Sequence, residues 1–193
     1  GVWLVWLLGW HASGGRARVA VWAALIAAFA TSLWPYSKFG FNAPLAAVLV
    51  TASVYFSLAW AETGRARAAC LAGGACGLAL LTRHELALIA IPSLAVIASA
   101  RRRPWWQPVV WWAVGAAPPA IVWLWYNHVR FGSVVETGYL RDETIGMGGS
   151  LAAGLWGLLF SPGASVLLYS PVVVPALVAL MWARRDHPRL TWT

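Results

Sequence analysis

The sequence predicts an all-α membrane protein, a polytopic bundle of transmembrane helices that forms a single domain over residues 1–193. Three observations carry this prediction. First, 61% of the residues are hydrophobic and only 10% are charged, too few to cover the surface of a soluble domain of this length. Second, apolar segments alternate with short polar gaps along the whole chain. Third, positive charge is concentrated in every second gap, which is the positive-inside pattern of polytopic membrane proteins.

The charge distribution predicts the sidedness of the gaps. Ten of the fourteen Lys and Arg residues lie in four basic gaps, at residues 11–18, 61–67, 101–103 and 184–189. These gaps together have a net charge of +8, whereas the three others, at residues 35–42, 82–85 and 126–150, have none. We therefore expect the basic gaps to meet anionic lipid on the cytoplasmic side and the other three to be extracytoplasmic. This one-sided charge indicates a membrane-lipid partner and no nucleic-acid partner.

We expect about six spans and a truncated first one, at residues 1–10, 19–34, 43–60, 68–82, 86–100, 107–126 and 164–183. Trp34-Pro35 is expected to stop the second segment, and Pro44 suits the first turn of the third. Pro118-Pro119 is expected to kink the segment 107–126. Residues 151–160 are too short to cross a bilayer, so we predict a re-entrant or interfacial helix there.

The segments 68–82 and 86–100 are each shorter than the roughly 20 residues that a straight span needs. Two interpretations fit. The pair forms a hairpin with a tip slightly below the outer surface, or some residues of 82–85 are helical and complete the spans. Gly73 and Gly77 form a small-xxx-small pair that permits close helix packing.

The two ends of the sequence predict an internal fragment of a longer protein. The chain begins at Gly1 within an apolar run, without an initiator Met, and residues 189–193 look like the start of another apolar stretch.

Lys38 is the only lysine and lies in the extracytoplasmic gap 35–42, with Tyr36, a candidate for the substrate pocket, beside it. A lysine at this depth can pair with a lipid phosphate as a point charge. The alternative is a lysine that snorkels at a helix end.

The tip at 82–85 combines charges that are costly near a membrane unless they are paired or face a polar cavity. Arg83 is a candidate for bidentate phosphate binding, and Glu85 for orienting Arg83 or binding a sugar hydroxyl. His84 is a candidate proton carrier. The alternatives are a local Arg83–Glu85 pair and an ordinary interfacial histidine.

The gap 126–150 mixes aromatic, amide and charged side chains, which suits carbohydrate recognition. Its candidates for the substrate pocket are Asn127, Glu136 and Tyr139, and Arg130 is a further phosphate candidate. The alternative is an ordinary solvated loop. Nothing singles out Asp142 or Glu143 as a base. Two Ser-Pro breaks, in 159–163 and 168–171, predict interrupted helices that line a cavity.

No soluble-enzyme motif is present, and no His, Cys and Asp spacing indicates a metal cluster. We expect no cofactor and no protein metal site, and leave a lone divalent cation open.

Four motifs follow one another along the chain. The first two are Trp34-Pro-Tyr-Ser-Lys38 with Pro44, and Gly77-Leu-Ala-Leu-Leu-Thr-Arg83 with Glu85. The last two are Tyr126-Asn127 with Arg130-Phe-Gly-Ser133 and Thr137-Gly-Tyr139, and Gly157-Leu-Leu-Phe-Ser-Pro-Gly163 with Leu168-Tyr-Ser-Pro171. In this order the chain resembles the GT-C superfamily of multispanning glycosyltransferases. It is similar to the dolichyl-phosphate-mannose–protein mannosyltransferase-like and bacterial RgtA/B/C/D-like groups.

The resemblance implies transfer of a sugar from a polyprenyl-phosphate carrier to an extracytoplasmic glycan, lipid or protein acceptor, in a bacterial inner or plasma membrane. It implies an acidic base in a first loop that lies upstream of this fragment, so the catalytic residue is unknown here. Lys38, Arg83 and Arg130 are its phosphate candidates. Ala43 stands where family members often have an acidic residue. The alternative functions are a transporter or lipid flippase, and a non-catalytic membrane subunit.

Overall fold

The computed structural model describes residues 1–38, 42–100, 104, 106–136, 150–163 and 165–186, and it is helical with no strand over these residues. This confirms the all-α prediction. The elements in chain order are α1 (Val2–Ala12), α2 (Ala17–Phe29), α3 (Leu33–Lys38), α4 (Ala43–Thr63), α5 (Ala66–Thr82), the 3₁₀ helix η1 (His84–Ile89), α6 (Ala90–Ser99), α7 (Trp106–Phe131), α8 (Leu151–Phe160), α9 (Val166–Tyr169) and α10 (Val173–Asp186).

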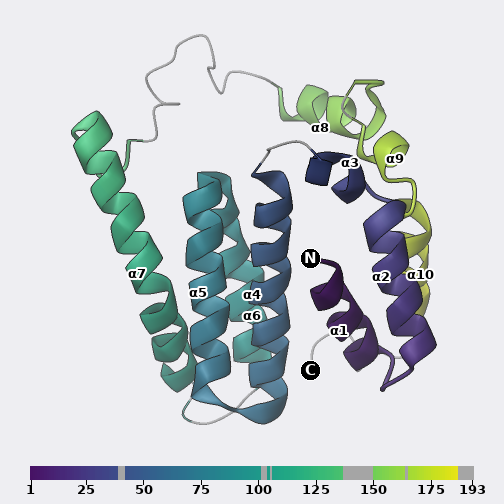
Figure 1. The fold of residues 1–193 in the computed structure, drawn as a ribbon, viewed down its shortest axis with the longest axis horizontal. Helices are drawn as coiled ribbons and strands as arrows, with labels where there is room; N and C mark the ends of the chain where they lie inside the picture. The colour runs from purple at the N-terminus through teal and green to yellow at the C-terminus, as the bar shows by residue number, and fades with distance from the viewer. Residues whose placement is uncertain (39–41, 101–103, 105, 137–149, 164, 187–193) are drawn as a thin grey trace.

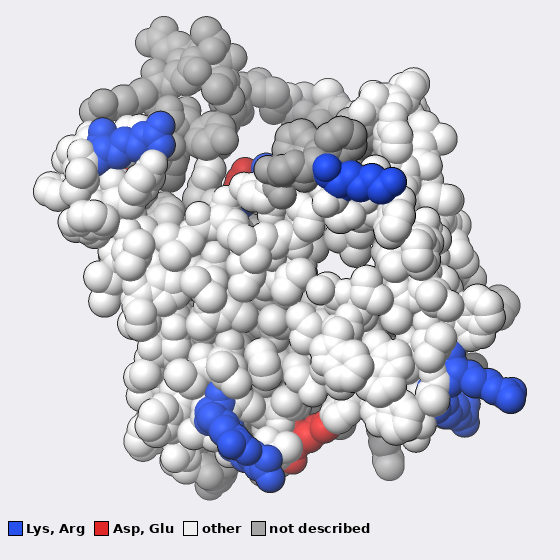
Figure 2. Space-filling model, viewed as in Figure 1, with Lys and Arg blue, Asp and Glu red and all other residues white. Residues whose placement is uncertain are grey.

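Helices α4 to α7 form a bundle, and the α1–α2 hairpin packs beside α4 (Figure 1). Two described helices, α4 and α7, are long and apolar enough to cross a membrane. Helices α1, α2, α5 and α8 and the η1–α6 segment are apolar but shorter. Figure 2 shows a broad uncharged band between two charged ends of the molecule. By length and composition, α4 and α7 are thus candidate membrane spans, while the expected number of about six spans stays a prediction.

Two long-range contacts define the ends of the bundle. His11 Nε2 pairs with Glu62 Oε2 and so joins the α1–α2 turn to the α4–α5 turn. We call this the Arg65 end. The basic residues that flank these two turns are Arg16, Arg18, Arg65 and Arg67. At the opposite end, Asn42 Nδ2 donates a 2.9 Å hydrogen bond to the Thr82 carbonyl oxygen and joins the start of α4 to the end of α5. We call this the Arg83 end.

The predicted close helix packing occurs between α5 and α7. A Cβ built on Gly73 would overlap the Trp112 carbonyl oxygen, and one on Gly77 would overlap the Pro119 ring. Gly115 of α7 lies in the same way against the Cys70 carbonyl oxygen. Only a hydrogen atom fits at these positions, so the two backbones approach each other directly.

A buried serine network, which the sequence did not predict, joins all four bundle helices. Ser57 Oγ and Ser93 Oγ lie 2.8 Å apart, and Trp112 Nε1 donates a 2.9 Å hydrogen bond to Ser93 Oγ. Ser53 Oγ donates to the Ala72 carbonyl oxygen at 3.0 Å. The three serines are fully buried, and these bonds satisfy their hydroxyl groups inside the apolar core.

The predicted end of the second segment is wrong. Helix α2 ends at Phe29, before Trp34-Pro35. Thr31 Oγ1 donates to the Ala27 carbonyl oxygen at 2.7 Å and accepts from the Leu33 N–H at 3.2 Å, which closes α2 and starts α3. Pro35 lies in the first turn of α3, where a missing N–H costs no helical hydrogen bond.

Two other predicted boundaries also need correction. Helix α7 runs through Pro118-Pro119 to Phe131, so residues 126–131 are helical and not part of a loop. The single span expected at 164–183 is divided into α9 and α10. The division falls at Ser170-Pro171, because the residue before a proline is disfavoured in the helical conformation.

Three further local expectations agree with the structure. Residues 151–160 form the separate short helix α8, and Pro44 lies in the first turn of α4. Of the two interpretations of 82–85, the second describes His84 and Glu85, which are helical in η1. Arg83 has an extended backbone between the two helices, with φ −156°.

Candidate functional site

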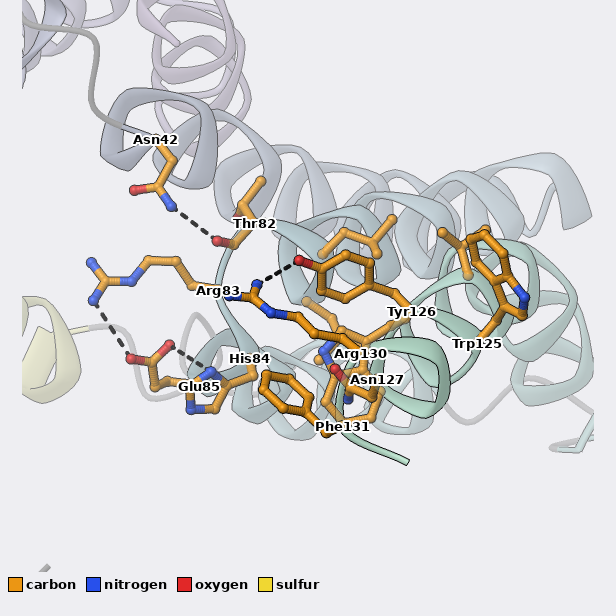
Figure 3. Close-up of a pocket in the computed structure, with 14 residues that line it drawn as sticks. Asn42, Thr82, Arg83, His84, Glu85, Trp125, Tyr126, Asn127, Arg130 and Phe131 are labelled. Carbon is orange, nitrogen blue, oxygen red and sulfur yellow. Dashed lines mark hydrogen bonds and ion pairs between the residues drawn. The ribbon is translucent and has the colours of Figure 1, made fainter. Parts of the chain in front are cut away.

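A hollow of about 590 Å³ lies at the Arg83 end, between α5, η1 and the last three turns of α7 (Figure 3). Its polar lining is Asn42, Thr82, Arg83, His84, Glu85, Tyr126, Asn127 and Arg130. Its apolar lining is Leu80, Leu81, Val122, Trp123, Trp125 and Phe131. The hollow therefore has a charged part and an apolar part side by side.

Arg83 and Glu85 form an ion pair at one side of the hollow. Arg83 Nη2 lies 3.5 Å from Glu85 Oε1, and both side chains are 49% exposed. The break after α5 produces this geometry, because the extended Arg83 is followed at once by the first turn of η1. Water screens a pair as exposed as this one, so it is weak in energy.

Glu85 is held in its charged form. A hydrogen bond from its own backbone N–H is the largest influence and lowers the pKa of Glu85. Burial opposes this effect, and the neighbouring His84 and Arg83 lower the pKa further. His84 Nδ1 lies 3.8 Å from Glu85 Oε2, which is too far for a hydrogen bond. His84 and Arg83 thus face one carboxylate from two sides, as Figure 3 shows.

Arg130 lies at the opposite side of the hollow and contacts two aromatic side chains. Its Nη1 donates a 2.6 Å hydrogen bond to the Tyr126 hydroxyl oxygen. Its guanidinium carbon lies 5.7 Å from the centre of the Tyr126 ring and 5.2 Å from that of Phe131. Tyr126 and Arg130 are four residues apart on α7, the spacing that brings two side chains together on one helix face.

Two asparagines hold backbone segments at the border of the hollow. Asn42 bonds to the Thr82 carbonyl oxygen, directly before Arg83. Asn127 is 3% exposed and donates a 3.3 Å hydrogen bond to the Val134 carbonyl oxygen, beyond the turn at Gly132. Gly132 has φ +74°, a conformation that favours glycine, so the chain can turn back toward Asn127 here.

The hollow brings together five of the predicted site residues and excludes three others. Its lining includes Arg83, His84, Glu85, Asn127 and Arg130, but not Tyr36, Lys38 or Glu136. Tyr139 lies outside the described residues.

The expectation that Lys38 shares one pocket with Arg83 is not met by the described residues. Lys38 Nζ lies 5.0 Å from the centre of the Trp34 ring, one helical turn earlier on α3. Its side chain is thus directed back along its own helix.

Sequence reasoning included Asn42, Thr82, Tyr126 and Phe131 in candidate segments but did not single them out as site residues. The i, i+4 pair Tyr126–Arg130 was a usable signal, but only for a chain that is helical as far as Phe131. The hydrogen bond from Asn42 to the Thr82 carbonyl oxygen joins residues forty positions apart, and no local sequence pattern predicts such a contact. Among the residues that the structure describes, no group of three His, Cys, Asp or Glu side chains is placed to hold a metal ion.

The chain has no significant match among protein-family models, curated proteins or solved structures.

Proposed function

We propose that this chain belongs to an integral-membrane glycosyltransferase, which moves a sugar from a polyprenyl-phosphate carrier to an extracytoplasmic glycan, lipid or protein acceptor. The observation that carries the proposal is the meeting of Arg83 and Arg130 at one hollow with an apolar wall. The carrier phosphate would lie in the charged part of the hollow, and the prenyl chain would follow the apolar wall.

The chemistry of the lining supports this assignment. As the glycosidic bond breaks, the leaving phosphate gains negative charge, and fixed cations beside it lower the barrier. The apolar wall comes from Leu80 and Leu81 of α5 and from Val122, Trp123 and Trp125 of α7. Trp125 is 63% exposed, so this wall is open to the surroundings of the bundle. An amphiphile with an anionic head and an apolar chain matches both parts.

The position of the charges favours transfer over transport. Substrate sites of many transporters lie near the bilayer midplane. Here the charged hollow lies at one end of the bundle, beyond the band without charges in Figure 2. We place this end on the extracytoplasmic side of a multi-pass protein in a bacterial inner or plasma membrane, because the basic turns lie at the Arg65 end.

A transfer assay tests the proposal. Membranes that contain the full-length protein are incubated with radiolabelled polyprenyl-phosphate sugars, and sugar transfer is compared for the wild type and for Arg83→Ala, Arg130→Ala and the control Arg16→Ala. We expect transfer by the wild type and the control, and a loss of about tenfold for Arg130→Ala, the size of one charge-assisted hydrogen bond. Absence of transfer by the wild type, or equal transfer by all four proteins, would contradict the proposal.

A further inference from the structure

We propose that the two arginines of the hollow have different roles: Arg130, positioned by Tyr126, binds the anionic group of the ligand, and Glu85 acts as an internal counter-ion that keeps Arg83 from competing for it. This inference rests on the proposed function only for the identity of the ligand, a prenyl phosphate. The unequal surroundings of the two guanidinium groups carry it.

Among the described residues, no acidic side chain pairs with Arg130. Within the described residues, its contacts are the Tyr126 hydroxyl and the rings of Tyr126 and Phe131, which carry no charge. The aromatic rings favour a cation over their faces without cancelling its charge. An anion that enters the hollow therefore meets a full positive charge at Arg130.

Arg130 is also oriented before the ligand arrives. One guanidinium nitrogen is used by the Tyr126 hydroxyl, and the two rings limit the freedom of the planar group. The remaining N–H groups form a rigid fork that matches two phosphate oxygens. Little side-chain entropy is then lost on binding, and this makes Tyr126 a positioning residue for Arg130.

Arg83 has the opposite surroundings. Its guanidinium group lies 3.5 Å from the Glu85 carboxylate. In Figure 3 its side chain extends away from Tyr126 and Arg130, toward Glu85. The lowered pKa of Glu85 keeps that carboxylate charged. A phosphate that approaches Arg83 must displace Glu85 or tolerate its like charge, and either event reduces what Arg83 adds to binding.

Equilibrium dialysis of a radiolabelled prenyl phosphate against the full-length protein in detergent tests the inference. The variants are Arg130→Gln, Arg83→Gln, Glu85→Gln and the double variant Arg83→Gln/Glu85→Gln. We expect Arg130→Gln to weaken binding by at least about tenfold, because a hydrogen bond to a charged group is lost. Arg83→Gln should weaken binding by less than about threefold, and Glu85→Gln should tighten it by about threefold, the range of an exposed ion pair. The gain from Glu85→Gln should disappear in the double variant.

The role of Tyr126 needs a readout that general loss of structure would not produce. Each protein is therefore also tested with the prenyl alcohol of the same chain length. We expect Tyr126→Phe to weaken binding of the phosphate while binding of the alcohol is unchanged. We expect Arg130→Lys to restore part of the selectivity for phosphate over alcohol that Arg130→Gln loses. Equal loss of both ligands in Tyr126→Phe would overturn the positioning role.

Two further results would overturn the inference as a whole: Arg83→Gln weakening binding as much as Arg130→Gln, or the alcohol binding as tightly as the phosphate to the wild type. Inorganic phosphate competing as well as prenyl phosphate, with the same order of variants, would support the division of roles and assign it to a free phosphate. If sugar transfer is absent while Arg130→Gln still weakens binding of the prenyl phosphate as expected, the proposed function fails and this inference stands.

Discussion

Gly73 of α5 lies against the backbone of Trp112 in α7, so closely that a Cβ on Gly73 would overlap the Trp112 carbonyl oxygen. This contact and those at Gly77 and Gly115 hold the two helices together in their middle parts. Beyond them, α7 leans away from α5 toward the Arg83 end, as Figure 1 shows. The hollow lies between the separated ends.

Replacement of Gly73 should therefore destabilise the bundle. We expect Gly73→Ala to lower the free energy of unfolding by about 1–3 kcal/mol, the usual cost of overpacking. Gly154→Ala in α8 is the matched control, because no atom lies within 4 Å of its added Cβ and alanine favours a helix. Unfolding in detergent, followed by circular dichroism, measures both. A Gly73→Ala protein as stable as the wild type would contradict the close packing.

The serine network predicts that a second substitution, at Ser93, lowers the free energy of unfolding. Ser93→Ala removes the acceptor of the Trp112 indole N–H and the partner of Ser57, so we expect a loss of about 1–2 kcal/mol from buried groups left unsatisfied. Ser99→Ala on the same helix should change little, since Ser99 bonds only within its own helix, to the Val96 carbonyl oxygen. The double variant Ser93→Ala/Trp112→Phe should lose less than the sum of the single variants, because the two groups share one bond. Additive losses would argue against the network.

Asn42 should control the mobility of the backbone at Arg83. Asn42→Ala removes the hydrogen bond to the Thr82 carbonyl oxygen, which joins two segments distant in sequence. We expect faster amide hydrogen exchange in a peptide that spans residues 82–86, measured by mass spectrometry, with unchanged exchange in the middle of α5. Ser37→Ala is the control, because Ser37 bonds only to Trp34 within α3. Unchanged exchange at 82–86 would show that Asn42 does not hold this segment.

Glu85 predicts a pH dependence of known sign. Its pKa is lowered in the folded chain, so its contribution to stability is present above the ordinary carboxyl pKa and is lost as the pH falls through the lowered value. We expect the difference in unfolding midpoint between wild type and Glu85→Gln to shrink on acidification from about pH 7 to about pH 3. Because His84 is present in both proteins, its own effect on stability is common to both sides of the comparison. A difference that grows in acid would reverse the sign and contradict the assignment.

The two ends of the bundle should lie on opposite sides of the membrane. In a background without Cys70 and Cys76, we expect a membrane-impermeant maleimide to label Arg83→Cys from outside intact cells. Arg65→Cys should react only after the membrane is opened, because the basic turns face the cytoplasm. Labelling of both residues from the same side would refute the topology.

The sequence predicted those parts of the fold that depend on local composition. The boundary at Pro44, the small α8 helix and the close packing through Gly73 follow from residue type and spacing, and each is present in the structure. Boundaries that depend on competing signals were less predictable. Thr31 ended α2 before Pro35 could do so, and α7 continued through Pro118-Pro119 to Phe131.

For the candidate site, the sequence alone determined which charges are separated from the basic turns, among them Lys38, Arg83, Glu85 and Arg130. Only the tertiary structure decided which of them share a hollow, because that depends on where α5, η1 and α7 end relative to one another. It placed Arg130 beside Tyr126, paired Arg83 with Glu85 and left Lys38 over Trp34. A charge pattern can be read directly from the sequence, whereas the direction of a side chain at a helix end is set by packing between helices distant in sequence.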